Sequence, residues 1–401
     1  MLASVLKRAG GLGIGTAVGQ GIVLAGTPFL VRIYGPASFG ILALLLTATN
    51  ISIAVGCARF DLALPSAPDV DVMPLARLCA TIAAGLAIVI ALAAILVAPH
   101  LSGGPFRELV RHPLLLGITV LSGALFQLVS SAQLRRGAIA VMAGLRAFQG
   151  MIFVGLALLP AIGLLWAQAL SYAPALLLLP GVLRGGKAGG GVRDVAARYR
   201  SFATLGLPGA ILDVIGYSLC IWIVTYAYGA AGSGELSQVQ RIVGAPLMLV
   251  SISLGQILLR QSAEMAGDPV GLRQLLSRLL ALMACGAILA LVVLAVIGKP
   301  VLDIVLGSKW NIDTRFILAI SAAVFVRAIV SPVSAILATA RRFDLALRWQ
   351  ILYFASASVL FTLASRSLAL DDFVIFYALH EGILYLIYLR IIMSIFRKAE
   401  I

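Results

Sequence analysis

Long apolar segments separated by short polar joints fill almost the whole chain of 401 residues. About 20 consecutive apolar residues cross a bilayer as a helix, and lipid leaves only helices and closed barrels able to satisfy the backbone. The segments lack the period-two alternation of barrel strands, so we predict an all-α integral membrane protein of twelve spans. The predicted spans are residues 9–31, 39–58, 78–98, 114–133, 138–159, 161–183, 204–226, 236–258, 278–297, 316–338, 349–367 and 373–396.

Composition narrows the class of protein further. Hydrophobic residues make up 61% of the chain and charged residues 11%, whereas a soluble chain has about 45–50% apolar and roughly 25% charged residues. A soluble enzyme and a nucleic-acid-binding protein are therefore poor interpretations. The net charge of +14 comes from basic residues that lie between the spans. Most of them fall in one set of loops, which predicts that both termini are cytoplasmic.

One glycine-rich segment, residues 184–203, divides the spans six and six. It begins RGGKAGGG but lacks both the spacing of a phosphate-binding loop and a preceding strand. We interpret it as a cytoplasmic linker between an N-terminal bundle at residues 1–183 and a C-terminal bundle at residues 204–401. Its last part, VRDVAARYRSF, predicts a short basic helix that lies on anionic lipid headgroups.

The two halves of the chain carry matching motifs in the same order. YGPASFGIL (Tyr34–Leu42) follows the first predicted span, and YGAAGSGEL (Tyr228–Leu236) follows the seventh; paired arginines follow the fourth and the tenth. Six spans separate equivalent features, so each repeat begins on the same side of the membrane. We predict two bundles related by a pseudo-two-fold axis along the membrane normal.

Small residues and prolines predict the local shape of the helices. Gly11, Gly15 and Gly19 share one face of the first span and predict close helix packing. Prolines within spans predict kinks, which serve either to open the bundle or to fix its packing. These prolines are Pro28, Pro174, Pro208, Pro246 and Pro332.

Charged side chains at membrane depth are the strongest sign of function, because a charge at the bilayer centre costs about 2.5–3.5 kcal/mol even on a lenient scale. Arg146, Arg241 and Arg327 fall inside predicted spans. Either they line an internal cavity that attracts anions, or they bond across helices to Asp213 or Glu381. The excess of basic over acidic groups suits a phosphate-bearing substrate better than a cation.

No arrangement of residues in the sequence points to catalysis, a metal or a cofactor. The histidines are scattered, and no paired-carboxylate cluster or Ser/His/Asp set is present. The cysteines lie in apolar runs without CxxC spacing and are predicted to be buried free thiols. They are Cys57, Cys79, Cys220 and Cys285. We therefore expect a transporter and not an enzyme.

Several stretches resemble a known family when they are taken in order. They are GIGTAVGQGIVLAGTPFLVRIYGPASFGILALL, GCARFDLALP, RYRSFATLGLPGAILDVIGYSL, GSGELSQVQRIVGAPLMLVSISLGQIL and VLGSKW. In them the chain resembles the polysaccharide-biosynthesis exporters and O-antigen flippases (the Wzx type) of the multidrug/oligosaccharidyl-lipid/polysaccharide exporter superfamily. The resemblance covers most of the chain and implies a MATE-like fold, in which two six-helix bundles form a V around a central cavity.

The resemblance also implies a function. It is the movement of an undecaprenyl-pyrophosphate-linked oligosaccharide (an O-antigen, capsule or exopolysaccharide repeat unit) from the cytoplasmic to the periplasmic leaflet of the bacterial inner membrane. Its partners would be membrane lipids and the polysaccharide polymerase and glycosyltransferases of the same pathway. A drug or metabolite antiporter of the same superfamily is the first alternative, and a membrane polysaccharide polymerase is the second.

Two residues match a motif of the family directly. Arg59 and Asp61 correspond to its Gly-Arg-x-Asp/Glu-like ending of the second span, with Ala58 in place of the glycine, and they form either a local structural pair or the polar mouth of a cavity. Arg241 matches the basic position of the eighth-helix stretch. We predict that arginine forks bind pyrophosphate oxygens in a groove. The predicted groove residues are Arg59, Arg146, Arg241 and Arg327, and the residues predicted to couple transport to a proton or sodium gradient are Asp61, Asp213 and Glu381.

Overall fold

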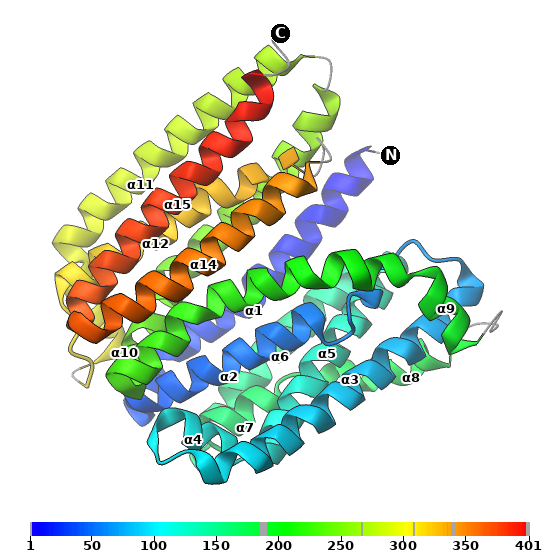
Figure 1. Cartoon of the computed structure of the whole chain (residues 1–401), viewed down its shortest axis with the longest axis horizontal. Coiled ribbons are helices and arrows are strands. Elements are labelled where there is room, and N and C mark those ends of the chain that lie inside the picture. Colours follow the sequence, from blue (N-terminus) through cyan, green and yellow to red (C-terminus); the bar gives the residue numbers. More distant parts are fainter. Residues whose placement is uncertain are drawn as a thin grey trace. The chain divides into compact units, whose positions relative to one another are not determined.

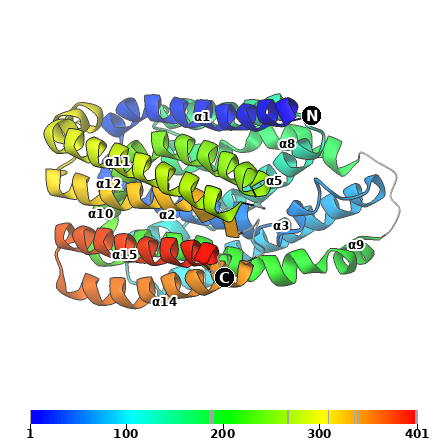
Figure 2. The same cartoon turned by 90° about the horizontal axis from the view of Figure 1, so that it is seen from above.

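The computed structural model describes residues 2–184, 191–265, 268–307, 309–334, 336–337 and 342–397, so residues 185–190 of the predicted linker lie outside it. In these ranges every regular element is helical and none is a strand, which confirms the all-α prediction (Figure 1, Figure 2). The helices are α1 (Leu2–Ile33), α2 (Pro36–Val55), α3 (Asp69–Val97), α4 (Gly104–Val110), α5 (Pro113–Arg135), α6 (Ile139–Ala157), α7 (Gly163–Leu170), α8 (Ala173–Leu183), α9 (Val192–Arg198), α10 (Arg200–Glu264), α11 (Pro269–Leu306), α12 (Thr314–Val330), α14 (Phe343–Ser367) and α15 (Leu370–Arg397).

Every predicted span overlaps a described helix, but the sixth span is divided between α7 and α8, and the seventh and eighth spans both lie in α10. Ten described helices are long and apolar enough to cross a membrane, and α1 adds the shorter apolar stretch Ala17–Ile33. One of the ten lies in α10, where Gly229 has the non-helical angles φ 81° and ψ 179°. Glycine adopts this backbone without strain because it has no Cβ. The break separates the seventh span from the eighth, and the prediction of a multi-pass helical membrane protein is confirmed.

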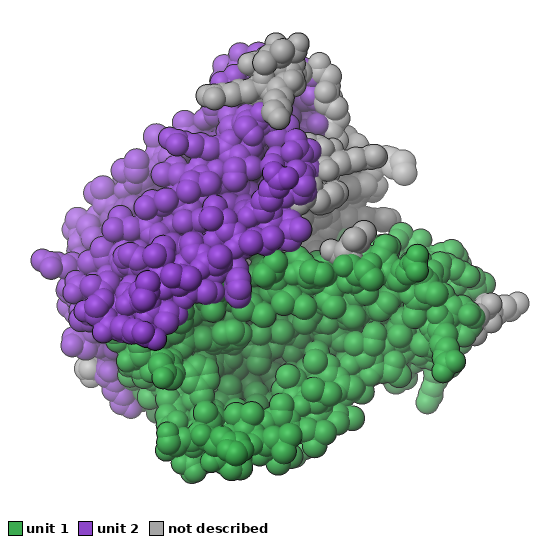
Figure 3. All heavy atoms as spheres, in the orientation of Figure 1, with its two compact units in different colours: residues 1–234 green, residues 235–401 purple. Residues whose placement is uncertain are grey.

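The chain forms two compact units, unit 1 at residues 1–234 and unit 2 at residues 235–401 (Figure 3). The seventh predicted span lies in unit 1, where Trp222 Nε1 donates a hydrogen bond to Thr47 Oγ1 of α2 at 2.8 Å. The division into two bundles of six spans at residues 184–203 stays a prediction.

Within unit 1, the two repeated motifs meet at a close crossing of α2 and α10. A Cβ atom added to Gly40 would overlap the carbonyl oxygen of Ala230, and one added to Gly234 would overlap the carbonyl oxygen of Pro36. Gly40 and Gly234 hold equivalent positions in the two motifs, and so do Pro36 and Ala230. The contact is thus reciprocal, as a local two-fold axis between the motifs requires, and it supports the predicted duplication.

Glycines also bring α1 and α6 together in unit 1. A Cβ on Gly19 would lie 2.6 Å from the carbonyl oxygen of Arg146, and one on Gly150 would lie 2.6 Å from the carbonyl oxygen of Gly19. Both separations are too short for a real Cβ, so the helices pack backbone to backbone. The predicted close packing of the first span is confirmed at Gly19.

The short helix α9 packs on the start of α3. Val195 of α9 is buried, and Arg198 Nη1 donates to both carboxylate oxygens of Asp71, at 2.7 and 2.6 Å. The Tyr199 hydroxyl donates to the same carboxylate at 3.0 Å. The predicted short helix is therefore present, and its contact with lipid headgroups stays a prediction.

Unit 2 is built around α12 and α15, which pack against each other along their length, with α14 beside α15 and α11 beside α12 (Figure 1). The outward side of α11 is apolar and exposed: Ile288, Val292 and Val296 are each more than half exposed. Cys285 is exposed on this helix, so the prediction of a buried thiol is wrong there. An apolar span at the outside of a bundle exposes side chains to lipid, and sequence hydrophobicity alone does not separate that setting from a core.

Candidate functional site

The most buried charges of unit 2 form a cluster across three helices, which we call the Arg327 cluster (Arg327, Tyr353, Glu381 and Tyr385). Arg327 lies in the last turn of α12, and its Nε donates to the Tyr385 hydroxyl of α15 at 2.8 Å. Its Nη2 donates to the Tyr353 hydroxyl of α14 at 3.4 Å. The Tyr353 hydroxyl in turn donates to Glu381 Oε1 at 2.5 Å. Arg327 Nε lies 3.8 Å from Glu381 Oε2, so the cluster contains an ion pair between α12 and α15.

Burial explains why these groups are held together. The side chain of Glu381 is completely buried and that of Arg327 is 25% exposed. An isolated carboxylate is strongly disfavoured in such a place, and a nearby guanidinium with hydrogen bonds offsets much of that cost. Even so, Glu381 Oε2 accepts no hydrogen bond within the described residues. One oxygen of a buried carboxylate is thus left able to take a proton.

Aromatic rings enclose the Arg327 cluster. The guanidinium of Arg327 lies 5.6 Å from the ring centre of Tyr385, within the range of a cation–π contact. Trp349 stacks on Tyr388 at 4.1 Å and donates its Nε1 hydrogen to the Leu384 carbonyl oxygen at 3.2 Å. The Trp349 ring centre also lies 5.4 Å from that of Tyr353 and 5.3 Å from that of Tyr385, so it packs against both tyrosines that accept from the arginine.

In unit 1, a buried carboxylate follows the second span. Asp61 lies in a short 3₁₀ turn, Phe60–Leu62, between the spanning helices α2 and α3, and its residue is 3% exposed. Asp61 Oδ2 accepts from Gln127 Nε2 of α5 at 3.1 Å and from Ser131 Oγ at 3.5 Å. Burial raises the pKa of Asp61, while the Gln127 hydrogen bond and the Arg59 charge oppose this rise. The carboxyl is therefore held mainly by neutral donors.

Arg59 precedes this turn in a left-handed conformation with φ 67°. Its Nη1 donates to the Ala54 carbonyl oxygen of α2 at 3.3 Å, and a cation suits this helix end. Its buried Nε has no hydrogen-bond partner in the described chain. No ion pair of 4.0 Å or less joins Arg59 to Asp61 among the described residues. The structure thus brings the two residues near each other but leaves one donor of the arginine free.

Arg146 lies inside α6 and has a different environment from Arg327. Its guanidinium carbon is 5.2 Å from the ring centre of Phe126 on α5. In the part of unit 1 that the structure describes, no carboxylate oxygen lies within 4.0 Å of it. Neutral polar groups are close by on α6 to α8, where Gln149 Nε2 donates to Ser171 Oγ at 3.2 Å. Arg146 is thus a half-buried cation that packs on an aromatic ring and, within the described part of unit 1, forms no ion pair.

The two remaining predicted residues lie on α10. Asp213 is exposed in unit 1, and Arg241 is half-buried in unit 2. The sequence leaves open whether the buried arginines bond across helices to Asp213 or Glu381. The structure shows such a bond, the ion pair between Arg327 and Glu381. The roles of all seven residues in substrate binding and ion coupling stay predictions.

Sequence reasoning did not find the tyrosines of the Arg327 cluster or Gln127. Helical spacing offers a signal for the tyrosines. Tyr385 follows Glu381 by four residues, and Tyr353 follows Trp349 by four, so each pair shares one helix face. Gln127 has no comparable signal, because its partner Asp61 comes from a distant turn.

Solved structures share this arrangement of helices. The lipid II flippase MurJ in an inward closed conformation has a TM-score of 0.73 and 13% identity, over 96% of this chain and 87% of that chain. An inward-facing multidrug resistance MATE transporter of the MOP superfamily has a TM-score of 0.64 and 12% identity, over 96% of each chain. The Vibrio cholerae MATE transporter VcmN in the bent form has a TM-score of 0.62 and 13% identity, over 99% of this chain and 97% of that one. The fold is thus that of the MATE-like multi-pass membrane transporters.

Sequence comparison assigns the chain to a family. Residues 29–314 match the family of polysaccharide biosynthesis proteins. This is well over half of the chain, which therefore belongs to the polysaccharide biosynthesis protein family, as its resemblance implies. A comparison with curated proteins finds no match.

Proposed function

We propose that the protein is a flippase that moves an undecaprenyl-pyrophosphate-linked oligosaccharide from the cytoplasmic to the periplasmic leaflet of the bacterial inner membrane. The observation that carries the proposal is Arg146, a cation inside a spanning helix with no carboxylate within 4.0 Å in the described chain. Membership in the polysaccharide biosynthesis protein family and the fold shared with a lipid II flippase support it.

The physical task of a flippase explains why such an arginine is useful. A sugar–pyrophosphate headgroup loses its hydration when it enters hydrocarbon, and polar protein groups have to replace that water. A guanidinium presents a planar fork of donors that fits phosphate oxygens. In our proposal Arg146 binds the pyrophosphate, and the free Nε of Arg59 supplies a second donor. Arg241 stays a predicted groove residue, and the lipid tail stays in the bilayer.

We assign a different task to the Arg327 cluster. The charge of Arg327 is already balanced by a buried carboxylate 3.8 Å away, so it gains less from a substrate anion than Arg146 does. Protonation of Glu381 would release Arg327 and turn it toward the substrate. Glu381 is our first candidate for coupling to a proton or sodium gradient, followed by Asp61 and Asp213.

The test compares arginine variants in a strain that lacks the gene. Arg146→Ala removes charge-assisted hydrogen bonds worth about 1.5–3 kcal/mol, so we expect export to fall roughly 10- to 100-fold. Lipid-linked oligosaccharide should then accumulate in the cytoplasmic leaflet, whereas Arg146→Lys keeps the charge and part of the activity. Arg390→Ala changes an exposed arginine of α15 and is the matched control. Normal surface polysaccharide with Arg146→Ala at equal membrane levels would reject the proposal.

A drug or metabolite antiporter is the second candidate, and Asp61 favours it. A buried carboxylate held by neutral donors can bind a cationic drug or exchange it for a proton. Under this function, expression should raise resistance to cationic drugs, and Asp61→Asn should abolish the effect. Under the flippase function, drug resistance should not depend on the protein, while surface polysaccharide should.

A further inference from the structure

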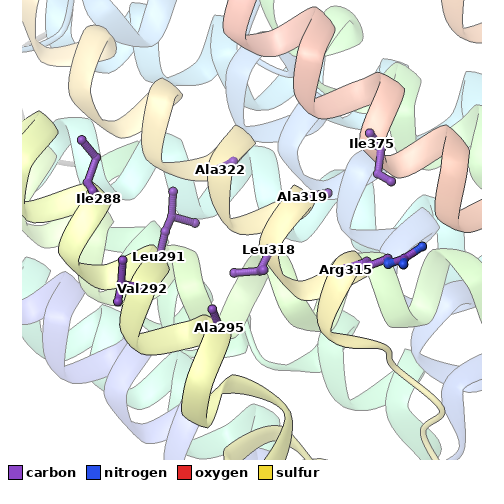
Figure 4. Close-up of a pocket in the computed structure, with 9 residues that line it drawn as sticks. All are labelled: Ile288, Leu291, Val292, Ala295, Arg315, Leu318, Ala319, Ala322 and Ile375. Carbon is purple, nitrogen blue, oxygen red and sulfur yellow. The ribbon is translucent and has the colours of Figure 1, made fainter.

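An apolar groove lies on unit 2, between α11, α12 and α15. It has a volume of 570 Å³, and the residues that line it are Ile288, Leu291, Val292, Ala295, Arg315, Leu318, Ala319, Ala322 and Ile375 (Figure 4). Eight of these nine side chains are aliphatic, so the groove offers almost nothing to a polar molecule. Residues 315 to 322 of α12 span about 10 Å at 1.5 Å per residue. A groove of this length and lining suits part of a hydrocarbon chain.

The ninth side chain gives the groove one charged end. Arg315 is the second residue of α12 and is exposed; it lies on the side of the groove away from Leu291 (Figure 4). No carboxylate lies within 4.0 Å of its guanidinium among the described residues. The neighbouring Asp313 caps α12 by accepting from the Thr314 amide at 2.7 Å. Lys299 also lies near this end, where its Nζ donates to the Ile312 carbonyl oxygen at 3.2 Å, but Asp303 Oδ2 is 3.6 Å from the same nitrogen.

The position of the charged end matches the surface of a bilayer. Arg315 begins a spanning helix, and Lys299 lies near the end of another. An arginine at the end of a span places its charge at headgroup level while its stem stays in the apolar region. The outward side of α11 next to the groove is exposed and apolar, so the groove opens where lipid is expected.

We propose that this groove binds one acyl chain of an anionic phospholipid, with the lipid phosphate on Arg315. A phosphodiester carries one negative charge, which a single guanidinium balances by a charge-assisted fork of hydrogen bonds. A polyprenyl pyrophosphate carries more charge than this end offers, since Lys299 is already 3.6 Å from Asp303. Under the predicted topology, the bound lipid belongs to the extracytoplasmic leaflet. This proposal uses none of the residues of the proposed substrate groove and does not depend on the flippase function.

The test measures lipids that stay bound to the purified protein. Delipidated protein is mixed with phosphatidylglycerol or phosphatidylcholine of the same acyl chains, and retained lipid is counted by native mass spectrometry. We expect the natural protein to prefer phosphatidylglycerol, and Arg315→Gln to weaken that binding about tenfold or more. Arg366→Gln is the matched control, because Arg366 is an exposed arginine in the last turn of α14.

A second pair of variants tests the apolar part of the groove. Ala319→Phe fills it and should lower retention of phosphatidylglycerol, whereas Ala355→Phe changes an exposed alanine of α14 and should not. Equal binding by Arg315→Gln and the natural protein would overturn the proposal. So would displacement of phosphatidylglycerol by equimolar undecaprenyl phosphate, because the groove would then hold a polyprenyl chain in preference to a phospholipid.

Discussion

The charges that the sequence places at or near membrane depth are held differently in the two units. In unit 2, Arg327 has a carboxylate 3.8 Å away and hydroxyl partners on two helices. In unit 1, Arg146 faces an aromatic ring, and Asp61 is held by an amide and a hydroxyl. Two halves that share sequence motifs have therefore placed their charges differently.

The difference suggests a division of labour. In a buried ion pair each charge is balanced by its partner, so the pair changes when one member gains a proton or binds an ion. Such a pair suits a switch. A cation without a carboxylate partner attracts an anion from outside, which suits a binding site. Under the proposed function, unit 2 regulates transport and unit 1 binds the substrate.

Removal of the Glu381 carboxylate should have the largest effect. Glu381→Ala leaves Arg327 with hydroxyl partners and no counter-charge. Breaking a fully buried pair costs about 3–5 kcal/mol, and the partial exposure of Arg327 places the expected loss near the lower end, about 3 kcal/mol. Unfolding of the purified protein in detergent, followed by tryptophan fluorescence, measures it.

The double variant Arg327→Met with Glu381→Leu separates stability from coupling. Apolar side chains in place of both charges should restore most of the lost stability, while export should stay defective. If export recovered together with stability, the pair would have a structural role only. The proposal that unit 2 holds a switch would then be rejected.

The crossing of the repeated motifs tests what the two halves have in common. Gly40→Ala adds a Cβ that overlaps the Ala230 carbonyl oxygen, and such overpacking costs about 1–3 kcal/mol. Gly21→Ala is the control, because a Cβ there meets nothing within 4 Å. Alanine favours a helix over glycine by roughly 0.5–1 kcal/mol, so the control should be neutral or stabilising. The same sign for both variants would contradict the close crossing.

Much of this fold could be predicted because lipid imposes a strong rule on sequence. Each span needs about 20 apolar residues, so span number and order follow from hydrophobicity, and the Tyr228-Gly229 motif marks the break in α10. Breaks at prolines within the spans are harder to predict. At Pro174 the predicted kink is a complete break between α7 and α8, whereas α10 continues through Pro208 and Pro246 without a non-helical angle at either. Whether a proline bends or ends a helix depends on neighbours that the sequence does not identify.

The candidate site could be predicted only in part. A charged residue inside a span stands out, which is how Arg146, Arg327 and Glu381 were found. Their partners did not stand out, because tyrosine and glutamine carry no charge and the sequence does not say which helices are adjacent. The pairing of Arg327 with Glu381 depends on the packing of α12 against α15, which is a property of the fold.

The protonation of Asp61 offers a smaller, pH-dependent effect. Burial raises its pKa above the unfolded value, so its contribution to stability is complete at low pH and is lost as the pH rises through the raised pKa. Gln127 donates to the carboxylate, and a hydrogen bond to a charged group is worth about 1.5–3 kcal/mol against 0.5–1.5 for a neutral one. Gln127→Leu should therefore cost more stability at high pH than at low pH. A cost independent of pH, while Asp61→Asn flattens the pH dependence of stability, would show that Gln127 acts by packing.

The contact between α9 and α3 should give the smallest effect, and it tests whether burial or mere pairing makes an ion pair important. Arg198 binds both oxygens of Asp71, a closer geometry than that of Arg327 with Glu381; the Asp71 side chain is 3% exposed, but that of Arg198 is 57% exposed. A guanidinium that stays in water gains little from its partner, and salt screens its charge, with a screening length of about 3 Å at 1 M. The Tyr199 hydroxyl also continues to donate to Asp71 when Arg198 is replaced. Arg198→Gln should thus lower the melting temperature slightly in low salt and not at all in about 1 M salt, while Glu381→Ala should be insensitive to salt. If Arg198→Gln instead destabilised the protein as much as Glu381→Ala, burial of the carboxylate alone would govern these pairs, and the contrast drawn between the two units would fail.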